Sequence, residues 1–538
     1  MDDRKPGRFG ILTALLALLL LLVLAAANAG LAGEPLRRFF AGEADFRQAA
    51  REISDAFLSD DFRPKEEAVT LNGLFARAAG RRVYRSVVRL SDGSLTSQNT
   101  DAVQPRAEVR RTAAFSDFLA KQGIPLLCVI APYKVPLAAG DLLPAGLEDA
   151  SNTQRDAFLR GLEERGVAAL DLRPLFSADR EQSARNFYRT DHHWTPEAAR
   201  AASGEILKRL ESLLGTSLDR SLADPACWDS HELPDWWIGS SGKRVGPLFA
   251  GTDPLLWLTP RFQTLQSFSF SRTNREYGFR KGDYASVCLY LDEYTAGRDL
   301  YHLSGDAVYM DKLYPLGIHR NLNAPNPRRI LLIGDSFCRS VQTFLAVEFT
   351  EVHMLDPRYY EASSLAQYAA WTRPDAVVIL SQTLSGSFFV DAGAEAQESW
   401  QNAHPARETL LSDAAVSAAA GSPESQKVPK EIEKGQVYHL SFHQVSCDGP
   451  LPECVSAVLV DQPSGEVAGA LVFDTDYGNA AQSFTWSFAV PDAARGAEEK
   501  ACELLLVPGL PETWNAPAAS AVFSGVTLER EAAVSPSP

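Results

Sequence analysis

The stretch RRILLIGDSFCRS, residues 328–340, places an apolar run directly before Gly334, Asp335 and Ser336. An apolar run of this kind predicts a strand of a parallel sheet, because such strands are covered on both faces. The glycine allows a sharp turn after the strand, and a following helix would aim its free N–H groups toward Ser336. Open α/β sheets bind ligands at the carboxyl ends of their strands. Ser336 is therefore a candidate nucleophile, and a helix N-cap is the alternative interpretation of the same turn.

Similar apolar runs lie at 124–132, 167–176 and 374–383, and segments with helical spacing separate them. One of these helices is expected to begin with Thr195 as N-cap and Pro196 as its first residue. Short apolar strands that alternate with helices indicate an α/β fold with a parallel sheet covered by helices on both faces.

Changes in composition along the chain predict its domain organisation. Residues 34–410 are expected to form the α/β domain, interrupted at about 218–325 by an irregular insertion rich in aromatic residues. Residues 411–430 contain small residues, Ser and Pro, which is typical of a linker. Short alternating strands over 431–531 predict a small β-sandwich, and residues 532–538 are left as a tail.

The first 33 residues (1–33) contain an uncharged apolar run, Ile11–Ala27, preceded by three basic residues. The basic residues place the N-terminus in the cytoplasm, so the rest of the chain is expected to be extracytoplasmic. The run is close to the minimum length for a membrane span, and Ala27-Asn28-Ala29 resembles a signal-peptidase site. We favour an uncleaved membrane anchor over a secreted, cleaved form. Residues 34–80, which are charged and helical in pattern, would then form a stalk or cap helix near the membrane.

Charge and cysteine content exclude several classes of function. The 538 residues carry a net charge of −16, which argues against nucleic acid as a partner because phosphate binding requires clustered Lys and Arg. The seven cysteines include no C-x-x-C pair, which disfavours a structural zinc site. Cys447 and Cys454 are close enough in sequence for a disulfide, but two separate thiols fit equally well.

The segment FYRTDHHWTPEAA, residues 187–199, contains a base and a carboxylate that could serve a serine nucleophile. In an extended chain Asp191 and His193 point to the same side, so the carboxylate can orient one imidazole nitrogen while the other faces a substrate. His192 would then point the other way. Two alternatives remain, namely a zinc or manganese site and a helix cap formed by Asp191. Because no second cluster of ligands is present, we predict no metal and no other cofactor.

Together, LLIGDSF and YRTDHHWT resemble the motifs of SGNH-hydrolase-like proteins of the DHHW-motif group, which are related to the alginate O-acetyltransferase family of bacterial exopolysaccharide systems. PYKVPL, GSSGKR and the segment 353–380 extend the resemblance over roughly residues 50–390. It implies an SGNH-hydrolase-like parallel sheet flanked by helices. The order of the motifs is permuted, since the Asp and His precede the Ser.

Carried onto this sequence, the resemblance implies a catalytic triad of Asp191, His193 and Ser336. Ser336 would take an acetyl group as an ester, His193 would act as base and then as acid, and Asp191 would orient the imidazole. The remaining site residues carry weaker signals. For the oxyanion hole we name Gly239 and Ser240 of WIGSSG. As substrate contacts we name two basic and two exposed aromatic side chains, although each fits a surface or core role equally well: Lys134, Arg339, Trp236 and Trp237.

The function implied by the resemblance is transfer of acetyl groups onto hydroxyls of a secreted polysaccharide or cell-wall glycan, with a membrane-bound O-acyltransferase as acetyl donor. One alternative is an acetyl esterase, because the same acyl-enzyme serves both reactions and the exclusion of water decides between them. Another is a non-catalytic protein that binds or assembles polysaccharide. The C-terminal module either binds carbohydrate or stabilises the enzyme.

Overall fold

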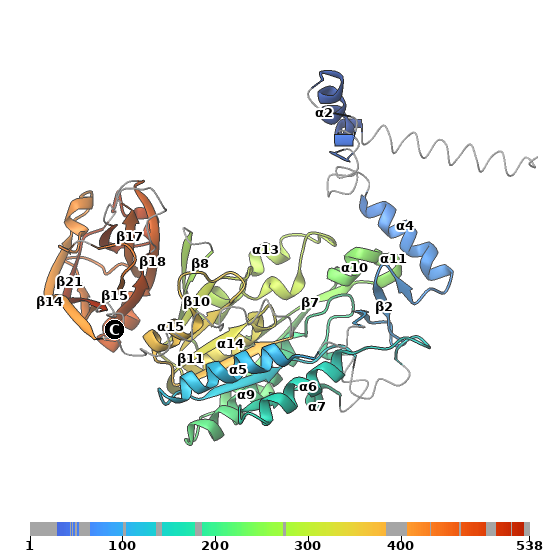
Figure 1. Ribbon diagram of the computed structural model, residues 1–538, viewed down its shortest axis with the longest axis horizontal. Helices are drawn as coiled ribbons and strands as arrows, with labels where there is room; N and C mark the ends of the chain where they lie inside the picture. The colour runs from blue at the N-terminus through green and yellow to red at the C-terminus, as the bar shows by residue number, and fades with distance from the viewer. Residues whose placement is uncertain are drawn as a thin grey trace, which may run out of the picture.

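The structure is a computed structural model, and Figure 1 shows its helices and strands. It describes residues 29–42, 45, 47–48, 51–52, 65–99, 104–135, 142–177, 185–272, 276–382, 406–430, 432–461, 464–490, 502–517 and 519–531. The predicted anchor Ile11–Ala27 and the tail 532–538 lie outside these residues. None of the helices within them is long and apolar enough to cross a membrane.

An eight-stranded sheet forms the centre of the fold, in the order β5-β4-β13-β11-β12-β10-β8-β9. The strands from β5 to β12 are parallel, whereas β10, β8 and β9 join the sheet antiparallel. Their bounds are β4 Leu126–Ile130, β5 Ala169–Asp171, β8 Gln266–Ser271, β9 Tyr277–Gly282, β10 Leu316–Asn321, β11 Asn326–Gly334, β12 Phe349–Leu355 and β13 Ala376–Ser381.

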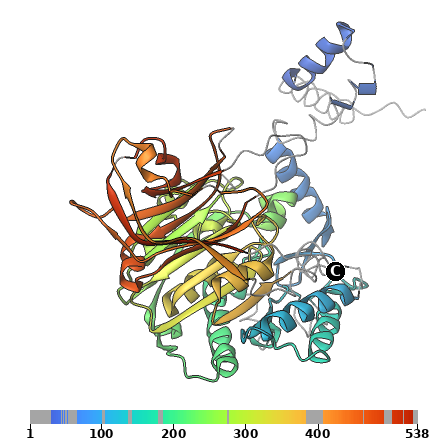
Figure 2. The ribbon, with the colours of Figure 1, turned by 60° about the vertical axis from the view of Figure 1, so that its left-hand side comes forward.

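Helices cover both faces of this sheet, which confirms the predicted α/β fold (Figures 1 and 2). Successive side chains of a strand point to opposite faces. Leu332 of β11 therefore packs with α9 and α14, while Leu331 packs with α5, α6 and α15. The helix bounds are α5 Arg106–Ala120, α6 Ser151–Glu163, α7 Arg173–Ser177, α9 Pro196–Leu214, α12 Tyr284–Cys288, α13 Leu291–Thr295, α14 Cys338–Glu348 and α15 Leu365–Thr372.

The helix after the Asp-His segment begins where the sequence predicts. Thr195 is the N-cap of α9 and accepts a hydrogen bond from the backbone N–H of Ala198, and Pro196 is the first helical residue. Gly215 ends the helix at a positive φ of 62°, a conformation that glycine adopts without steric cost.

The predicted insertion at 218–325 is only partly an insertion. It contributes β8, β9 and β10 to the central sheet, together with the separate ribbon of β6 (Trp228–Trp237) and β7 (Asp253–Pro260). The three strands escaped prediction because buried polar residues such as Ser269 and His319 interrupt the apolar pattern that marks a buried strand.

Two further sheets at the C-terminal end share one hydrophobic core. The predicted linker 411–430 is wrong in its first half, because β14 occupies Arg407–Ala418 and pairs with β21. Few side chains of β14 are buried, so its sequence lacks the apolar alternation of a strand. The other bounds are β15 Val437–Phe442, β16 Gln444–Ser446, β17 Cys454–Asp461, β18 Glu466–Asp474, α17 Thr475–Ala481, β19 Phe484–Ala489, β20 Cys502–Pro508 and β21 Ala521–Glu531.

Cys447 and Cys454 are both free thiols, so the alternative without a disulfide holds. At the N-terminal side, the residues described within 34–80 include helix α4 (Lys65–Ala78) and most of helix α2 (Ala29–Phe40). A small sheet of β1 (Val83–Tyr84), β2 (Val87–Arg89) and β3 (Leu95–Ser97) follows them.

Candidate active site

Ser336 lies in the turn between β11 and α14, at the carboxyl end of a central parallel strand. The turn needs a glycine before it, because a Cβ on Gly334 would overlap the carbonyl oxygen of Leu380 on the neighbouring strand and Sγ of Cys338. Ser336 itself stays partly exposed. Its hydroxyl is thus held at the sheet edge where a ligand can reach it.

Asp335 fixes this turn to the adjacent strand. One carboxylate oxygen accepts hydrogen bonds from the Ser381 hydroxyl (2.8 Å) and the Gln382 backbone N–H (3.0 Å), at the end of β13. The other oxygen accepts from the Phe337 N–H (3.0 Å). Asp335 therefore holds the turn ahead of α14, whose N-cap residue is Phe337 without a side-chain cap, so the Ser336 hydroxyl does not cap the helix and stays available for chemistry.

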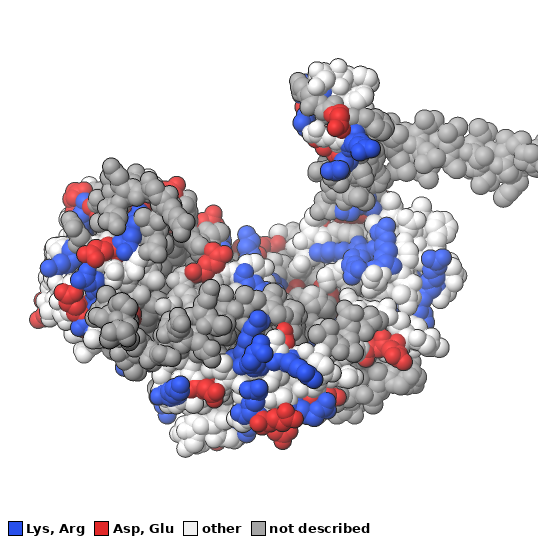
Figure 3. All heavy atoms as spheres, viewed as in Figure 1, with Lys and Arg blue, Asp and Glu red and all other residues white. Residues whose placement is uncertain are grey.

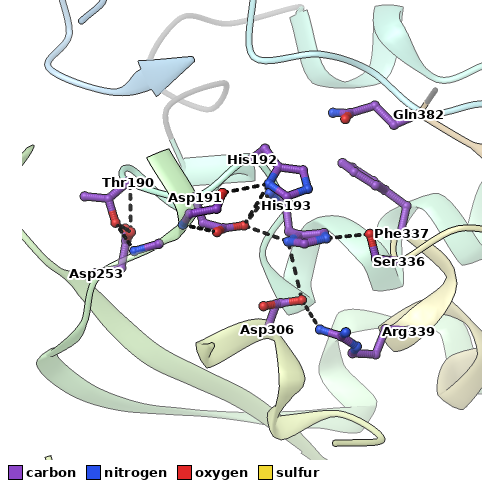
Figure 4. A network of polar contacts seen from close by, with 12 residues as sticks. Thr190, Asp191, His192, His193, Asp253, Asp306, Ser336, Phe337, Arg339 and Gln382 are labelled. Atoms are coloured by element: carbon purple, nitrogen blue, oxygen red, sulfur yellow. Dashed lines mark hydrogen bonds and ion pairs between the residues drawn. The ribbon is translucent and has the colours of Figure 1, made fainter. Parts of the chain in front are cut away.

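Asp191, His193 and Ser336 lie in one hydrogen-bonded line (Figure 4). Nε2 of His193 is 2.8 Å from Oγ of Ser336, and Nδ1 of the same ring is 2.6 Å from Oδ1 of Asp191. Asp191 and His193 are both buried. A carboxylate on Nδ1 favours the tautomer in which Nε2 is free to accept a proton, so the arrangement can activate the serine.

His192 does not point away from this pair, contrary to the prediction. Its ring centroid is 3.9 Å from that of His193, and its Nδ1 is 3.0 Å from Oγ of Ser240. The segment is bent rather than extended, because Oδ1 of Asp191 also accepts a hydrogen bond from the His193 backbone N–H (3.0 Å). The alternation of an extended strand therefore does not apply here.

Gly239 and Ser240 hold the orienting carboxylate and are not free to form an oxyanion hole. The Ser240 N–H donates to Oδ2 of Asp191 (2.7 Å), and the Gly239 N–H donates to Oγ1 of Thr190 (2.6 Å). A Cβ on Gly239 would overlap the backbone of Asp191, so only glycine permits this close approach. The predicted oxyanion role is corrected, since both N–H groups are already used.

Asp253 at the start of β7 anchors the residues that precede Asp191. It accepts hydrogen bonds from the backbone N–H groups of Arg189 (2.5 Å) and Thr190 (2.7 Å), and from the Thr190 hydroxyl. The same hydroxyl accepts the bond from Gly239. Every bond of this chain of contacts restricts the position of Asp191, and none of it was predicted.

Lys134, predicted as a substrate contact, is buried and serves the same segment. Its Nζ donates to the carbonyl oxygens of Leu95 (2.8 Å) and Arg189 (3.0 Å). Burial lowers the pKa of Lys134 to about 8. The predicted contact with substrate is corrected, because the buried ammonium group donates to backbone carbonyl oxygens inside the protein.

Arg339, also predicted as a substrate contact, forms an ion pair with Asp306. Only 12% of the Arg339 side chain is exposed. Oδ2 of Asp306 lies 3.4 Å from Nδ1 of His193, so a second carboxylate faces the ring beside Asp191 (Figure 4). The guanidinium therefore neutralises a charge of the site itself. Arg339 also lines the small pocket that contains Ser336 and His193, so its contact with substrate stays a prediction.

The two tryptophans differ from the prediction of exposed aromatic residues. Trp237 is fully buried, and its Nε1 donates to the carbonyl oxygen of Pro254 (2.9 Å). Trp236 is half-buried, with Nε1 bonded to the carbonyl oxygen of Tyr294 (2.9 Å). Trp237 is thus a core residue, whereas contact of Trp236 with substrate stays a prediction.

Comparison with known families covers part of the chain that forms this site. Residues 90–221 match the family described as "SGNH hydrolase-like domain, acetyltransferase AlgX". This segment is similar to that family. The match includes Asp191 and His193 and ends before Ser336. The resemblance inferred from the motifs is therefore confirmed over this segment.

Three solved structures are similar to parts of this chain. PatB1 of Bacillus cereus, solved with a sulfonyl adduct, has 19% identity and a TM-score of 0.47 over 57% of this chain and 97% of its own. A DHHW family protein from Eubacterium siraeum has 13% identity and a TM-score of 0.42 over 59% and 94%. AlgX of Pseudomonas aeruginosa has 16% identity and a TM-score of 0.34 over 83% and 95%. No curated protein matches the chain.

Burial and neighbouring charges shift the pKa values of Asp191, His192 and His193, and the directions of these shifts suit a general base at His193. Burial alone would lower the pKa of His193, but the carboxylates of Asp306 and Asp191 outweigh it and raise that pKa above its ordinary value. Burial opposes the charge of Asp191, yet the interaction with His193 lowers the pKa of this carboxyl well below its usual range. Burial and the neighbouring His193 lower the pKa of His192 to about 4, so His192 is neutral at neutral pH.

The same side chains raise the question of a metal. Asp191, His192 and His193 offer ligand atoms within 4.8 Å of one another, the single such grouping in the described part of the chain. Oδ1 of Asp191 already accepts two hydrogen bonds from His193, and a metal on Nδ1 would replace one of these protons. The expected absence of a metal stays a prediction.

Asp306→Asn is expected to lower the pKa of His193. The substitution removes a carboxylate 3.4 Å from Nδ1 and leaves the charge of Arg339 uncompensated, and both changes disfavour the imidazolium. NMR titration of the imidazole measures the shift directly. Asp311→Asn in the same loop is the matched control. An unchanged or raised His193 pKa would show that Asp306 does not act on this ring.

Proposed function

We propose that this protein is an extracytoplasmic polysaccharide O-acetyltransferase that uses Ser336, His193 and Asp191 through an acetyl-Ser336 intermediate. The observation that carries the proposal is the contact of 2.8 Å between Nε2 of His193 and Oγ of Ser336, with Asp191 on the opposite nitrogen of the ring. The family match over residues 90–221 adds the acetyl group as the one transferred.

In the first half-reaction, Oγ of Ser336 attacks the carbonyl carbon of an acetyl donor and gives its proton to Nε2 of His193. The bond between the acetyl carbon and the donor oxygen then breaks, and the imidazolium returns this proton to the leaving oxygen. Asp191 keeps its negative charge throughout and stabilises the imidazolium. The products are acetyl-Ser336 and the free donor alcohol.

In the second half-reaction, a hydroxyl of the sugar acceptor attacks the acetyl-Ser336 carbonyl and gives its proton to His193. The bond to Oγ breaks, and the proton passes from His193 to Oγ, which restores Ser336. For the negative oxygen of both tetrahedral intermediates we propose the backbone N–H of Ser336 as a donor. It makes no backbone hydrogen bond to another residue of the described chain, and it lies at the N-terminal end of α14.

The acceptor in this proposal is a secreted polysaccharide or cell-wall glycan, and the donor is a membrane-bound O-acyltransferase that presents the acetyl group outside the cytoplasm. The basic residues before the apolar run Ile11–Ala27 support this side of the membrane. The half-buried Trp236 is the remaining aromatic candidate for contact with sugar.

Incubation of the full chain with a chromogenic acetyl ester, with and without oligosaccharide acceptors, tests the proposal. We expect mass spectrometry to find one acetyl group on the peptide that contains Ser336, and acetylated oligosaccharide as product. Release of acetate with no product on any acceptor would favour the esterase. If neither an acetylated serine nor ester turnover is found, the protein binds or assembles polysaccharide without catalysis.

A further inference from the structure

Helix α4 presents apolar side chains to solvent on the side that faces away from the protein. Its buried residues are Val69, Gly73 and Ala76, at the spacing of one helical face. Leu71 (46%), Leu74 (41%) and Phe75 (63%) are exposed on the remaining surface. Because a surface helix normally turns polar residues outward, this arrangement calls for a partner.

The packed side of α4 is held too tightly for the helix to rotate its apolar residues inward. A Cβ on Gly73 would overlap the carbonyl oxygen of Val245, and one on Gly246 would meet the backbone of Thr70. These contacts seat α4 against α10 (Ser240–Val245) and α11 (Pro247–Ala250). The hydroxyl of Tyr301 also contacts the hydroxyl of Thr70 at 2.9 Å.

Further exposed apolar side chains lie beside α4. Leu248 of α11 (46%) and Val83 of β1 (40%) join the three on the helix, and the five together make up five of the twelve large hydrophobic residues exposed in the described chain. The Arg77 guanidinium donates to the Leu248 carbonyl oxygen at 3.1 Å, which places the end of α4 next to α11. These five side chains therefore form a group on and beside α4, while the other seven lie on other segments of the described chain.

Arginines surround these apolar residues. The exposed ones are Arg77, Arg81, Arg85, Arg189 and Arg244. Figure 3 shows basic side chains gathered over the α4, α10 and β2 end of the molecule. None of the five has a carboxylate within ion-pair distance among the described residues. The guanidinium groups of four of them, Arg77, Arg85, Arg189 and Arg244, donate to backbone carbonyl oxygens instead, as in the reciprocal contacts of Arg85 and Arg244 (3.3 and 2.9 Å).

The positive charge of this cluster acts on Arg89, a partly buried arginine beside it. Burial and the charges of Arg77, Arg189 and Arg82 lower the pKa of Arg89. In a chain with a net charge of −16, such a group of uncompensated cations indicates an anionic partner.

We propose that this face, formed by Leu71, Leu74, Phe75, Leu248 and the five exposed arginines and called here the α4 face, docks on an anionic lipid surface. The exposed Leu and Phe side chains can insert among the acyl chains of such a surface, and the surrounding arginines can bind its anionic headgroups. The predicted anchor ends at Ala27 and α4 begins at Lys65, so α4 is on the same N-terminal side of the chain as the anchor, with α2 between them.

Docking would also orient the candidate active site. The Gly242 N–H of α10 bonds to the Thr190 carbonyl oxygen (3.0 Å), and Thr190 precedes Asp191, so the α4 face and the site share one rigid contact. Docking would thus hold Ser336 at a fixed height above the membrane. The docking itself depends on the α4 face alone and not on the proposed chemistry.

The test compares the full chain reconstituted in nanodiscs of phosphatidylglycerol with phosphatidylcholine and in discs of phosphatidylcholine alone. We expect hydrogen exchange in peptides covering residues 65–89 and 240–250 to be several-fold slower in the anionic discs. About 1 M salt, where the Debye length is roughly 3 Å, should remove the difference.

An arginine near an anionic surface strengthens binding roughly fivefold. Arg77→Ser/Arg81→Ser/Arg85→Ser should therefore weaken docking about 100-fold.

The matched control is Arg110→Ser/Arg160→Ser/Arg165→Ser, which removes the same charge from exposed positions on and beside α5 and α6. It should keep the protection, and both variants should turn over a soluble ester equally, which separates docking from the chemistry. Equal protection in both kinds of disc would overturn the charged docking. Protection that appears only with a membrane protein partner, or with rising protein concentration without lipid, would replace the lipid by a protein surface or a second copy.

Discussion

Ser336→Ala is expected to lower turnover of an acetyl ester at least about 1,000-fold. The variant lacks the oxygen that attacks the acetyl group, while the methyl group of Ala leaves the turn between β11 and α14 intact, since Asp335 holds that turn and not Ser336. The remaining rate would come from His193 acting on water. The acetylated serine peptide should disappear from the mass spectrum along with the activity.

Ser212→Ala is the matched control, because Ser212 is an exposed serine on α9 whose hydroxyl bonds only to its own helix. Its ester turnover should equal that of the native protein. Native-like turnover by Ser336→Ala, in a protein with an unchanged circular dichroism spectrum, would exclude the serine mechanism. A metal-bound hydroxide at Asp191, His192 and His193 would then be the next candidate, and loss of activity on chelation would identify it.

Some strands of the central sheet can be predicted from the sequence alone, and others cannot. The apolar runs at 124–132 and 374–383 contain β4 and β13, because a strand covered on both faces must be apolar throughout. Neighbouring β12 was missed. It buries Glu351 and His353, which are paired with each other, and Glu351 is also paired with Arg329 of β11 (2.8 Å). Only the partner strands make such a sequence compatible with burial.

The residues of the candidate site also fall into those that could be predicted from the sequence and those that could not. The line from Asp191 to Ser336 could be proposed from residue types, since a base two residues from a carboxylate and a serine after a buried strand are local signals. Asp306 and Asp253 lie far away in sequence and have no such signal. Their roles depend on the loops that bring them to His193 and Thr190. The buried Trp237 shows the converse, because an aromatic pair in a polar segment does not reveal which ring enters the core.

Asp191→Asn is expected to lower kcat/KM for the ester about 1,000-fold or more. Oδ1 of Asp191 accepts two hydrogen bonds from His193, and Oδ2 accepts one from the Ser240 N–H. The amide of Asn has only one oxygen, so it can accept hydrogen bonds from His193 or from the Ser240 N–H but not from both. With its NH2 group toward His193 it would bind the tautomer that carries the proton on Nε2, and that tautomer cannot accept the proton of Ser336.

With the NH2 group toward Ser240, two donors face each other and the Gly239 loop must move, while the neutral amide no longer stabilises the imidazolium of His193. Either orientation therefore lowers the rate. Both orientations also lower the pKa of His193, because the negative charge of Asp191 is lost, so the acidic limb of the pH–rate profile should move to lower pH. Asp299→Asn is the matched control, since Asp299 accepts from His302 (2.9 Å) in an exposed loop and should have no effect.

The size of the loss separates the two carboxylates that face His193. A decrease of less than tenfold in Asp191→Asn would mean that Asp306, 3.4 Å from Nδ1, orients the ring, and the double variant Asp191→Asn/Asp306→Asn would then carry the large loss. If Asp191→Asn alone lowers kcat/KM about 1,000-fold and Asp306→Asn only shifts the His193 pKa, then Asp191, at 2.6 Å from Nδ1, orients the ring. Asp306, at 3.4 Å, then contributes only its charge. This division is expected, because a hydrogen bond selects the tautomer, whereas a charge beyond hydrogen-bond range acts on the ring only through its field.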